Sequence, residues 1–353
     1  MELTIIGTGG ARGWPEPGCP CASCAHAARS APAGPRGPYD VLLDGDRLAD
    51  GPPPDARTVP GGFTVARGGA RLLAAGGPGA VPRPEPGSGP YDLALLDLAA
   101  DPYALGALRA EGAVDAATRV VPVHLDHRWP SPDALARRLA QWGVAPVPDG
   151  TRLPVSGGAA DTAAGPEPYG TGLMGRTLVT GGSRSGKSAE AELRVAAEPH
   201  VTYVATGPRA DADPAWGARV AAHRARRPAH WTTEETAELV PLLALPRTGA
   251  LLIDGIGTWL AATMDDCGVW DAPEAGAGPA HDRVLRRVEA LTAAWRATRV
   301  PVVAVTDEVG GGLVPETRGG RYFRDVLGDL NQRLSAESER TVLVVAGRAV
   351  DLP

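Results

Sequence analysis

The residues best suited to chemistry form one glycine-rich run in the second half of the chain, GGSRSGKS at positions 181–188. The run matches the pattern G-x-x-x-x-G-K-[ST], in which the glycines let backbone N–H groups point at phosphate oxygens. In that pattern Lys187 neutralises the β- and γ-phosphates, and the Ser188 hydroxyl binds Mg²⁺. We therefore predict that a nucleoside triphosphate binds to Gly181, Gly182, Ser183, Arg184, Ser185, Gly186, Lys187 and Ser188. The loop alone leaves the reaction open.

Two other side chains in this half could take part in phosphate chemistry. Asp254 ends the apolar run ALLID, where acidic residues of P-loop enzymes often organise the metal; a helix cap or a turn would also suit an Asp there. His223 lies beside Arg224 on a predicted helix, and on the residues alone a solvated histidine on a basic face is the simpler interpretation. Nearby cations would keep its imidazole neutral, as a nucleophile requires.

Three of the four cysteines lie together, as Cys19, Cys21 and Cys24. The first residues, MELTIIGTGG, contain neither the basic nor the apolar segment of a secretory signal, so we expect a cytoplasmic protein. In a reducing cytoplasm, thiols spaced this closely indicate a metal site rather than disulfides. Three thiols without a metal remain the alternative.

The length and composition of the chain allow two ordinary domains. Its 353 residues include 43% hydrophobic and 22% charged residues, which is normal for a soluble globular protein. The net charge of −6 gives no electrostatic reason to expect nucleic acid or an anionic membrane as a partner. Residues 156–174 have the small, polar composition of a linker, so we place one domain at 1–155 and the other at 175–353.

The second domain must place the phosphate loop between a strand and a helix. Apolar segments without strict alternation predict buried strands, and amphipathic segments between them predict helices. The expected strands are 177–180, 200–206, 250–256, 300–308 and 340–347, and the expected helices are 188–198, 215–227, 281–298 and 324–339, with a long loop at 265–282. This alternation predicts an α/β domain with a mostly parallel sheet and helices on both faces.

Four blocks follow the phosphate loop in the order found in one enzyme family. They are Tyr203–Thr206; Arg219-Val220 with His223-Arg224, Arg227-Pro228, Trp231, Thr233 and Glu235; Leu251–Asp254 with Trp259-Leu260; and Glu308–Pro315 with Arg321, Phe323–Asp325, Gly328 and Asn331-Gln332. With the G-G-x-R-S-G-K-S form of the loop, residues 175–353 resemble the adenosylcobinamide kinase / adenosylcobinamide-phosphate guanylyltransferase family, which has a P-loop, RecA-like fold. Asp307 departs from its usual Asn, and Gly255 and Gly257 replace bulkier residues.

The resemblance implies two reactions of cobalamin biosynthesis. In the first, ATP or GTP phosphorylates adenosylcobinamide, with Lys187, Asp254 and Mg²⁺ on Ser188 serving the transfer. In the second, the matching histidine of the family is guanylylated, so His223 would take GMP from GTP and pass it to the phosphate, giving adenosylcobinamide-GDP. The nucleotide contacts implied outside the loop are Thr206, Gly207, Arg224, Arg227, Glu235 and Asp254. A homo-oligomer, such as a trimer, is also implied.

The first domain resembles a different fold. The strand and glycine turn at 3–10, the C-x-C-x-x-C of Cys19–Cys24 and the V-H-L-D-H at 123–127 are similar to a phosphodiesterase branch of the metallo-β-lactamase fold, an αββα arrangement. That resemblance implies a structural Zn²⁺ on Cys19, Cys21, Cys24 and His127, a tetrahedral set. The H-x-H-x-D-H motif of the catalytic metals is missing, and Asp97 and His124 alone cannot hold two metals. We therefore expect a degenerate, noncatalytic domain.

Three alternatives stay open on sequence grounds. The chain could be a P-loop NTPase of another class, such as a RecA-like motor, although it lacks basic DNA-binding loops. It could be a phosphodiesterase that acts through its first half, which the missing motif argues against. The first half could also be a zinc-stapled interaction module fused to an NTPase.

Overall fold

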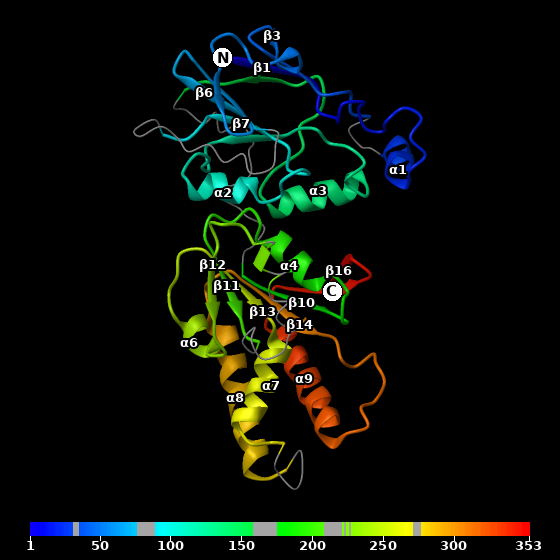
Figure 1. The fold of residues 1–353 in the computed structure, drawn as a ribbon, viewed down its shortest axis with the longest axis vertical. Helices are drawn as coiled ribbons and strands as arrows, with labels where there is room; N and C mark the ends of the chain where they lie inside the picture. The colour runs from blue at the N-terminus through cyan, green and yellow to red at the C-terminus, as the bar shows by residue number, and fades with distance from the viewer. Residues whose placement is uncertain are drawn as a thin grey trace. The chain divides into compact units, whose positions relative to one another are not determined.

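The structure is a computed structural model in which the chain divides into two compact units (Figure 1). The first comprises Met1–Gly172 with Ala196–Pro199, and the second comprises Leu173–Val195 with His200–Pro353. The residues that the structure describes are 1–30, 35–75, 89–157, 175–207, 221, 224–225, 227–270 and 277–353. The predicted linker at 156–174 therefore lies almost entirely outside the described residues.

Two β-sheets form the framework of the first unit. One is antiparallel, with the order β3-β2-β1-β9: Asp46–Arg47, Asp40–Leu43, Glu2–Gly7 and Arg152–Pro154. The other has the order β4-β5-β6-β7-β8: Arg57–Val59, Gly62–Arg67, Ala70–Ala75, Leu93–Leu96 and Arg119–Pro122. In this second sheet β6, β7 and β8 run parallel.

The two sheets share one hydrophobic core. Leu3, Ile5 and Leu43 of the first sheet lie in the same buried cluster as Leu72 and Leu95 of the second. The helices of this unit are α1 (Ala22–Ser30), η1 (Leu48–Asp50), α2 (Ala104–Ala110) and α3 (Pro132–Gln141). At the start of α3 the Ser131 hydroxyl accepts a hydrogen bond from the Ala134 N–H at 3.1 Å, the usual way to satisfy a helix N-terminus. The unit is thus a pair of packed sheets with helices.

The second unit contains a seven-stranded sheet of order β12-β11-β13-β14-β10-β15-β16. These strands are Thr232–Glu235, Val201–Ala205, Ala250–Asp254, Val302–Asp307, Arg176–Gly181, Arg340–Val345 and Arg348–Leu352. Every neighbouring pair is parallel except β15 with β16. The predicted α/β class with a mostly parallel sheet is confirmed; β12 and β16 were not predicted, because short polar or exposed strands carry no apolar pattern.

The helices of the second unit are α4 (Lys187–Arg194), α6 (Leu239–Ala244), α7 (Ile256–Asp266), α8 (Gly278–Ala297) and α9 (Arg318–Ala336). Helix α4 packs on β10 and β14 and has no residue in the buried cluster that the other four helices share. Residues of α6, α7, α8 and α9 share one buried cluster with β13 and β14, and Figure 1 shows α7, α8 and α9 side by side. Among the helices of the described residues, none combines the length and apolarity needed to cross a bilayer.

Several predicted boundaries of the second unit were wrong. The helix expected at 188–198 already ends at Arg194, and α9 begins at Arg318 rather than 324, because Thr317 caps it by accepting from the Gly320 N–H at 3.1 Å. Helix α7 was not predicted and shortens the loop expected at 265–282. The helix expected at 215–227 lies mostly outside the described residues.

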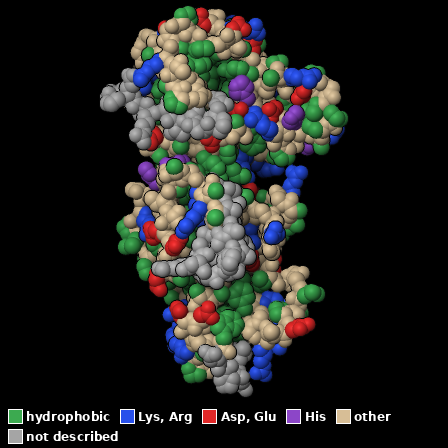
Figure 2. Space-filling model, viewed as in Figure 1, with side chains coloured by type: hydrophobic (Ala, Val, Ile, Leu, Met, Phe, Trp, Pro, Cys, Tyr) green, Lys and Arg blue, Asp and Glu red, His purple; other side chains and the backbone are tan. Residues whose placement is uncertain are grey.

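The surface does not concentrate charge of one sign on the face in view. In Figure 2 acidic and basic side chains are interspersed there, which agrees with a chain that carries 35 Lys and Arg against 41 Asp and Glu.

Candidate functional site

The phosphate loop connects the end of β10 to the start of α4. Gly186 has a φ of +97°, a left-handed conformation that glycine adopts without a steric cost, and it caps the N-terminus of α4. A Cβ on Gly181 would lie 2.5 Å from the Val344 carbonyl oxygen, so only glycine fits at the end of β10. The Gly347 N–H donates to the Ser185 carbonyl at 2.8 Å and ties the loop to the neighbouring hairpin. The loop is held open by glycines where backbone N–H groups must face a ligand.

Lys187 is the only lysine in the chain, and it points back across this loop. Its Nζ donates to the Gly182 carbonyl at 3.2 Å and forms an ion pair with Asp307 Oδ1 at 2.8 Å. The lysine side chain is 9% exposed and the aspartate side chain 47% exposed. The ammonium group is therefore fixed by the protein, whereas its counter-ion is open to exchange with an incoming phosphate.

Asp254 lies at the end of β13 and faces both the phosphate loop and a buried tyrosine. The Ser188 hydroxyl lies 3.4 Å from Asp254 Oδ1, and the Tyr203 hydroxyl donates to Oδ2. A hydroxyl and a carboxylate oxygen at this separation form the hard oxygen set that Mg²⁺ prefers. Ser188 and Asp254 therefore suit a magnesium ion next to the loop.

A short turn after β13 is fixed by two threonines. The Thr206 hydroxyl donates to the Gly255 carbonyl at 2.5 Å, accepts from the Gly255 N–H at 3.0 Å and lies 2.6 Å from the Thr258 hydroxyl. Thr206 is thus engaged in holding the turn that follows Asp254. A Cβ on Gly257 would lie 3.0 Å from Asp307 Oδ2, so glycine at 257 leaves room for the Asp307 carboxylate.

The predicted guanylylation segment is described only in part. His223 lies outside the described residues. Arg224 forms an ion pair with Glu235, the last residue of β12. The Arg227 guanidinium lies 3.4 Å from the centre of the Tyr203 ring, and its Nη1 donates to Thr233 at 3.3 Å.

The parallel register brings these groups to one edge of the sheet. Gly181 pairs with Asp307, and Ala205 pairs with both Asp254 and Glu235, so the carboxyl ends of five strands lie along one edge. Gly207 directly follows Thr206 beside this edge. In open α/β sheets ligands bind at this edge, outside the carboxyl ends of the strands.

Comparison with known proteins places this domain. Residues 177–352 match the model of the family described as cobinamide kinase / cobinamide phosphate guanyltransferase. The bifunctional adenosylcobalamin biosynthesis protein CobU of Salmonella typhimurium is 39% identical over 185 residues, which are 50% of this chain and 98% of that protein. The chain belongs to this family. It is accordingly a transferase of the kinase and nucleotidyltransferase type.

Two other relatives agree with this assignment. The protein of the same name from Escherichia coli is 37% identical over 180 residues, 50% of this chain and 98% of its own length. The bifunctional adenosylcobalamin biosynthesis protein CobP of Pseudomonas aeruginosa is 36% identical over 184 residues, 50% of this chain and 96% of its own length. The family domain is thus present here over nearly its full length.

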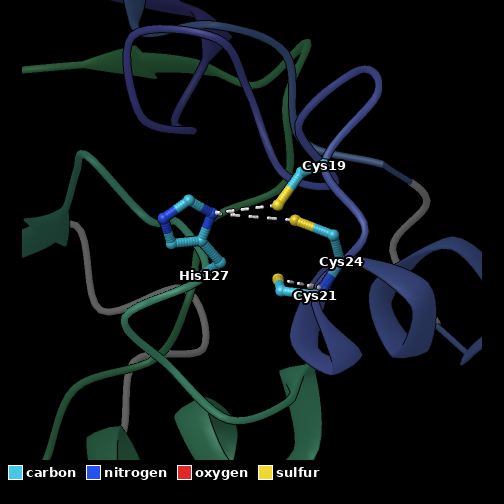
Figure 3. A group of neighbouring side chains, drawn as sticks. All are labelled: Cys19, Cys21, Cys24 and His127. Atoms are coloured by element: carbon cyan, nitrogen blue, oxygen red, sulfur yellow. Dashed lines mark hydrogen bonds between the residues drawn. The ribbon is translucent and has the colours of Figure 1, made fainter.

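A second candidate site lies in the first unit, where four metal-ligand side chains converge (Figure 3). The ligand atoms of Cys19, Cys21, Cys24 and His127 all lie within 4.8 Å of one another, and no other such group occurs among the described residues. His127 Nδ1 is 3.7 Å from Cys19 Sγ and 3.8 Å from Cys24 Sγ. Ligands of a tetrahedral Zn²⁺ stand about 3.5–3.8 Å apart for Zn–S and Zn–N bonds of about 2.3 and 2.0 Å.

The loop before α1 shapes this cluster. The Cys24 N–H donates to Cys21 Sγ, and the Glu16 N–H donates to Cys24 Sγ, each at 3.4 Å. The first of these bonds lowers the pKa of the Cys21 thiol, whereas burial raises the pKa of Cys24 to about 11. The donor set and its spacing fit Zn²⁺.

Arg128 forms ion pairs with two carboxylates of this unit, those of Asp97 and Asp126. Arg128 Nη2 lies 3.2 Å from Asp97 Oδ2 and donates to the His124 carbonyl at 2.8 Å, while its Nε donates to Asp126 at 2.9 Å. Burial lowers the pKa of His124, whose ring lies 4.3 Å from that of Tyr39. Asp97, one of the two residues that the sequence suggested as remnants of a catalytic metal site, is thus paired with a guanidinium.

Two residues of the nucleotide site were not predicted. Tyr203 was recognised only as part of a strand, and Asp307 only as a departure from the family pattern. A tyrosine in an otherwise apolar strand is a usable signal, since a buried phenol needs a hydrogen-bond partner. The partner of Asp307 is 120 positions away in the chain and depends on the register of β10 with β14.

Proposed function

We propose that this chain phosphorylates adenosylcobinamide with ATP or GTP and then converts the product to adenosylcobinamide-GDP. The observation that carries the proposal is the meeting of Lys187, Ser188 and Asp254 at one edge of the sheet, in a domain of this family. These are the groups that phosphoryl transfer requires, namely a fixed cation and oxygen ligands beside a phosphate-binding loop.

In the kinase step the chain acts by positioning and by neutralising charge. Backbone N–H groups of the loop and the N-terminus of α4 orient the phosphates, and Lys187 exchanges Asp307 for phosphate oxygens. Ser188 and Asp254 would hold Mg²⁺, which neutralises charge that develops on the phosphates. The acceptor hydroxyl oxygen forms a bond to the γ-phosphorus, the bond to the β-phosphate oxygen breaks, and the hydroxyl proton leaves to water.

In the guanylyl step we assign the nucleophile to His223. A ring nitrogen forms a bond to the α-phosphorus of GTP, and pyrophosphate departs with the electrons of the broken P–O bond. A phosphate oxygen of adenosylcobinamide phosphate then attacks the same phosphorus and releases the histidine. Arg224 and Arg227, two arginines of this segment that the structure describes, supply positive charge for both transfers.

For the first unit we propose a degenerate metallo-β-lactamase-like domain with a structural zinc. Two packed sheets with helices are consistent with that fold, and Cys19, Cys21, Cys24 and His127 would hold Zn²⁺. A closed set of four protein ligands would leave the metal no position for a substrate, so its role would be to stabilise the loop before α1. The ion pair between Arg128 and Asp97 supports a domain without phosphodiesterase activity, because it uses a carboxylate that a catalytic metal would need.

The direct test supplies adenosylcobinamide with γ-labelled GTP or ATP and Mg²⁺ and separates the corrinoid by chromatography. The proposal expects label on the corrinoid, and a second product after unlabelled GTP is added. Release of labelled phosphate without transfer to the corrinoid would favour an NTPase of another class. A metal-dependent phosphodiesterase activity in a Lys187→Ala variant would contradict the role proposed for the first unit.

A further inference from the structure

One tyrosine connects the magnesium carboxylate with the arginine of the guanylylation segment. Tyr203 lies two residues before the end of β11, and only 2% of its surface is exposed. Its hydroxyl donates to Asp254 Oδ2, and the Arg227 guanidinium covers its ring at 3.4 Å. No reaction step proposed above uses this residue.

The two carboxylate oxygens of Asp254 have different partners. Oδ2 accepts the phenol hydrogen, and Oδ1 faces Ser188 at 3.4 Å. Outer partners that hydrogen-bond a ligating carboxylate fix its orientation and tune the affinity for the metal. The carboxylate is thereby turned so that Oδ1 lies on the side of the Ser188 hydroxyl.

The surroundings of Tyr203 keep its phenol a donor. Because a carboxylate can only accept hydrogen bonds, the Tyr203 hydroxyl is the donor in its contact with Asp254. The stacked Arg227 fixes the ring from the other side, and Thr233 of β12 accepts a hydrogen bond from Arg227 at 3.3 Å. The phenol therefore has one defined position.

We propose that Tyr203 is a positioning residue for the nucleotide-bound magnesium, holding Asp254 Oδ1 toward the cation, and that Arg227 fixes Tyr203 in that position. This inference rests on the proposed role of Asp254 as the magnesium carboxylate. It assigns no contact with the corrinoid to Tyr203. Its consequence is that the kinase and guanylyl steps depend on magnesium through the same pair of residues.

The test is the magnesium dependence of a Tyr203→Phe variant, which removes the hydroxyl and keeps the ring. Binding of a fluorescent GTP analogue is titrated with Mg²⁺, and the kinase rate is measured over the same Mg²⁺ range. Because loss of an outer-shell partner lowers metal affinity about 10–100-fold, half-saturation should need at least about tenfold more Mg²⁺. At saturating Mg²⁺ the rate should return to nearly that of the unchanged protein.

Tyr322→Phe is the matched control. Tyr322 is also buried in the second unit, and its hydroxyl lies 2.7 Å from His281 Nδ1 rather than near the phosphate loop. Its loss should leave the magnesium titration unchanged. In an Asp254→Asn background, adding Tyr203→Phe should cause no further loss, because the two residues act through one contact.

Two results would overturn the inference: a Tyr203→Phe titration curve that superimposes on that of the unchanged protein, or a defect that excess Mg²⁺ does not relieve. The binding titration needs no corrinoid. It can therefore fail while adenosylcobinamide is still phosphorylated, and it can succeed if the corrinoid substrate is wrong.

Discussion

The two units differ in what surrounds their reactive side chains. In the second unit Lys187 is fixed by the protein, but its counter-ion Asp307 is half exposed and can give way to a phosphate. In the first unit the carboxylates Asp97 and Asp126 are bound to Arg128, which belongs to the chain itself. The first arrangement suits a ligand that enters and leaves, and the second needs no ligand.

The cysteine cluster adds to this contrast. Its four ligand atoms already lie within 4.8 Å of one another, whereas the groups of the nucleotide site come from the ends of several strands and face an open edge. A preformed set of four protein ligands is typical of a structural metal. The comparison predicts that changes in the second unit affect turnover and that changes in the first affect stability.

The largest effect is expected for Lys187→Ala. Removal of a fixed cation from a phosphoryl-transfer site should lower the kinase rate by about 10²–10³-fold, with the zinc content unchanged.

Since Lys187 is the only lysine, reductive methylation with labelled formaldehyde marks it and the N-terminal amine alone. The NMR signal of the methylated Lys187 side chain should shift when Mg²⁺–GTP binds, with the signal of the methylated N-terminal amine as internal control. A Lys187 signal that ignores the nucleotide would contradict this account.

Cys24→Ser should destabilise the first unit and leave the activity of the second unit nearly unchanged. A structural Zn²⁺ stabilises small domains by about 10–16 kcal/mol in peptide systems, so loss of one ligand should remove most of the bound zinc and lower the melting temperature of this unit. Kinase activity should stay within about twofold. Cys267→Ala, which changes the one cysteine outside the cluster, is the control and should retain one zinc per chain. Equal zinc contents in the two variants, by elemental analysis, would remove the zinc proposal.

A smaller effect is expected for Asp307→Asn. The change removes a half-exposed carboxylate that competes with phosphate for Lys187, so nucleotide affinity should rise by about two- to fivefold, the range of a partly exposed ion pair. Isothermal titration with GTP and Mg²⁺ measures this directly. Weaker binding would instead assign the carboxylate a favourable contact with the bound complex.

How much of the fold and the site the sequence predicts depends on how far apart the interacting residues lie along the chain. The phosphate loop and the end of β13 were predicted, because their patterns are local and parallel strands end at one edge of a sheet. Helix α7 was missed, since glycines occupy its beginning and most of its residues are apolar. The bond from Tyr203 to Asp254 spans 51 positions, and no local pattern reports it. The sequence likewise suggested Asp97 as a relic of a metal site without showing its ion pair with Arg128.

The smallest predicted effect concerns the framework of the second unit. Hydrogen bonds from Arg176 lower the pKa of Glu339 to about 2 from the model-peptide value of 4.5. A lowered carboxyl pKa in the folded state means that the contribution to stability is present above pH 4.5 and is lost as the pH falls toward 2. Because Glu339 is 44% exposed, solvent screening limits this contribution, and Glu339→Gln should cost under about 1 kcal/mol at pH 7. Urea unfolding of both proteins at pH 7 and pH 3 should show the difference shrinking in acid. A difference that stays constant with pH would exclude this cause.

The central claim is tested most directly by incubating the protein with α-labelled GTP and Mg²⁺ and isolating the protein in alkali. The account predicts an acid-labile, base-stable label that adenosylcobinamide phosphate discharges. His223→Ala should abolish the label, while His281→Gln, a change within α8, should retain it. Persistence of the label in His223→Ala, or its absence in a protein that still binds GTP, would contradict the proposed guanylyl transfer.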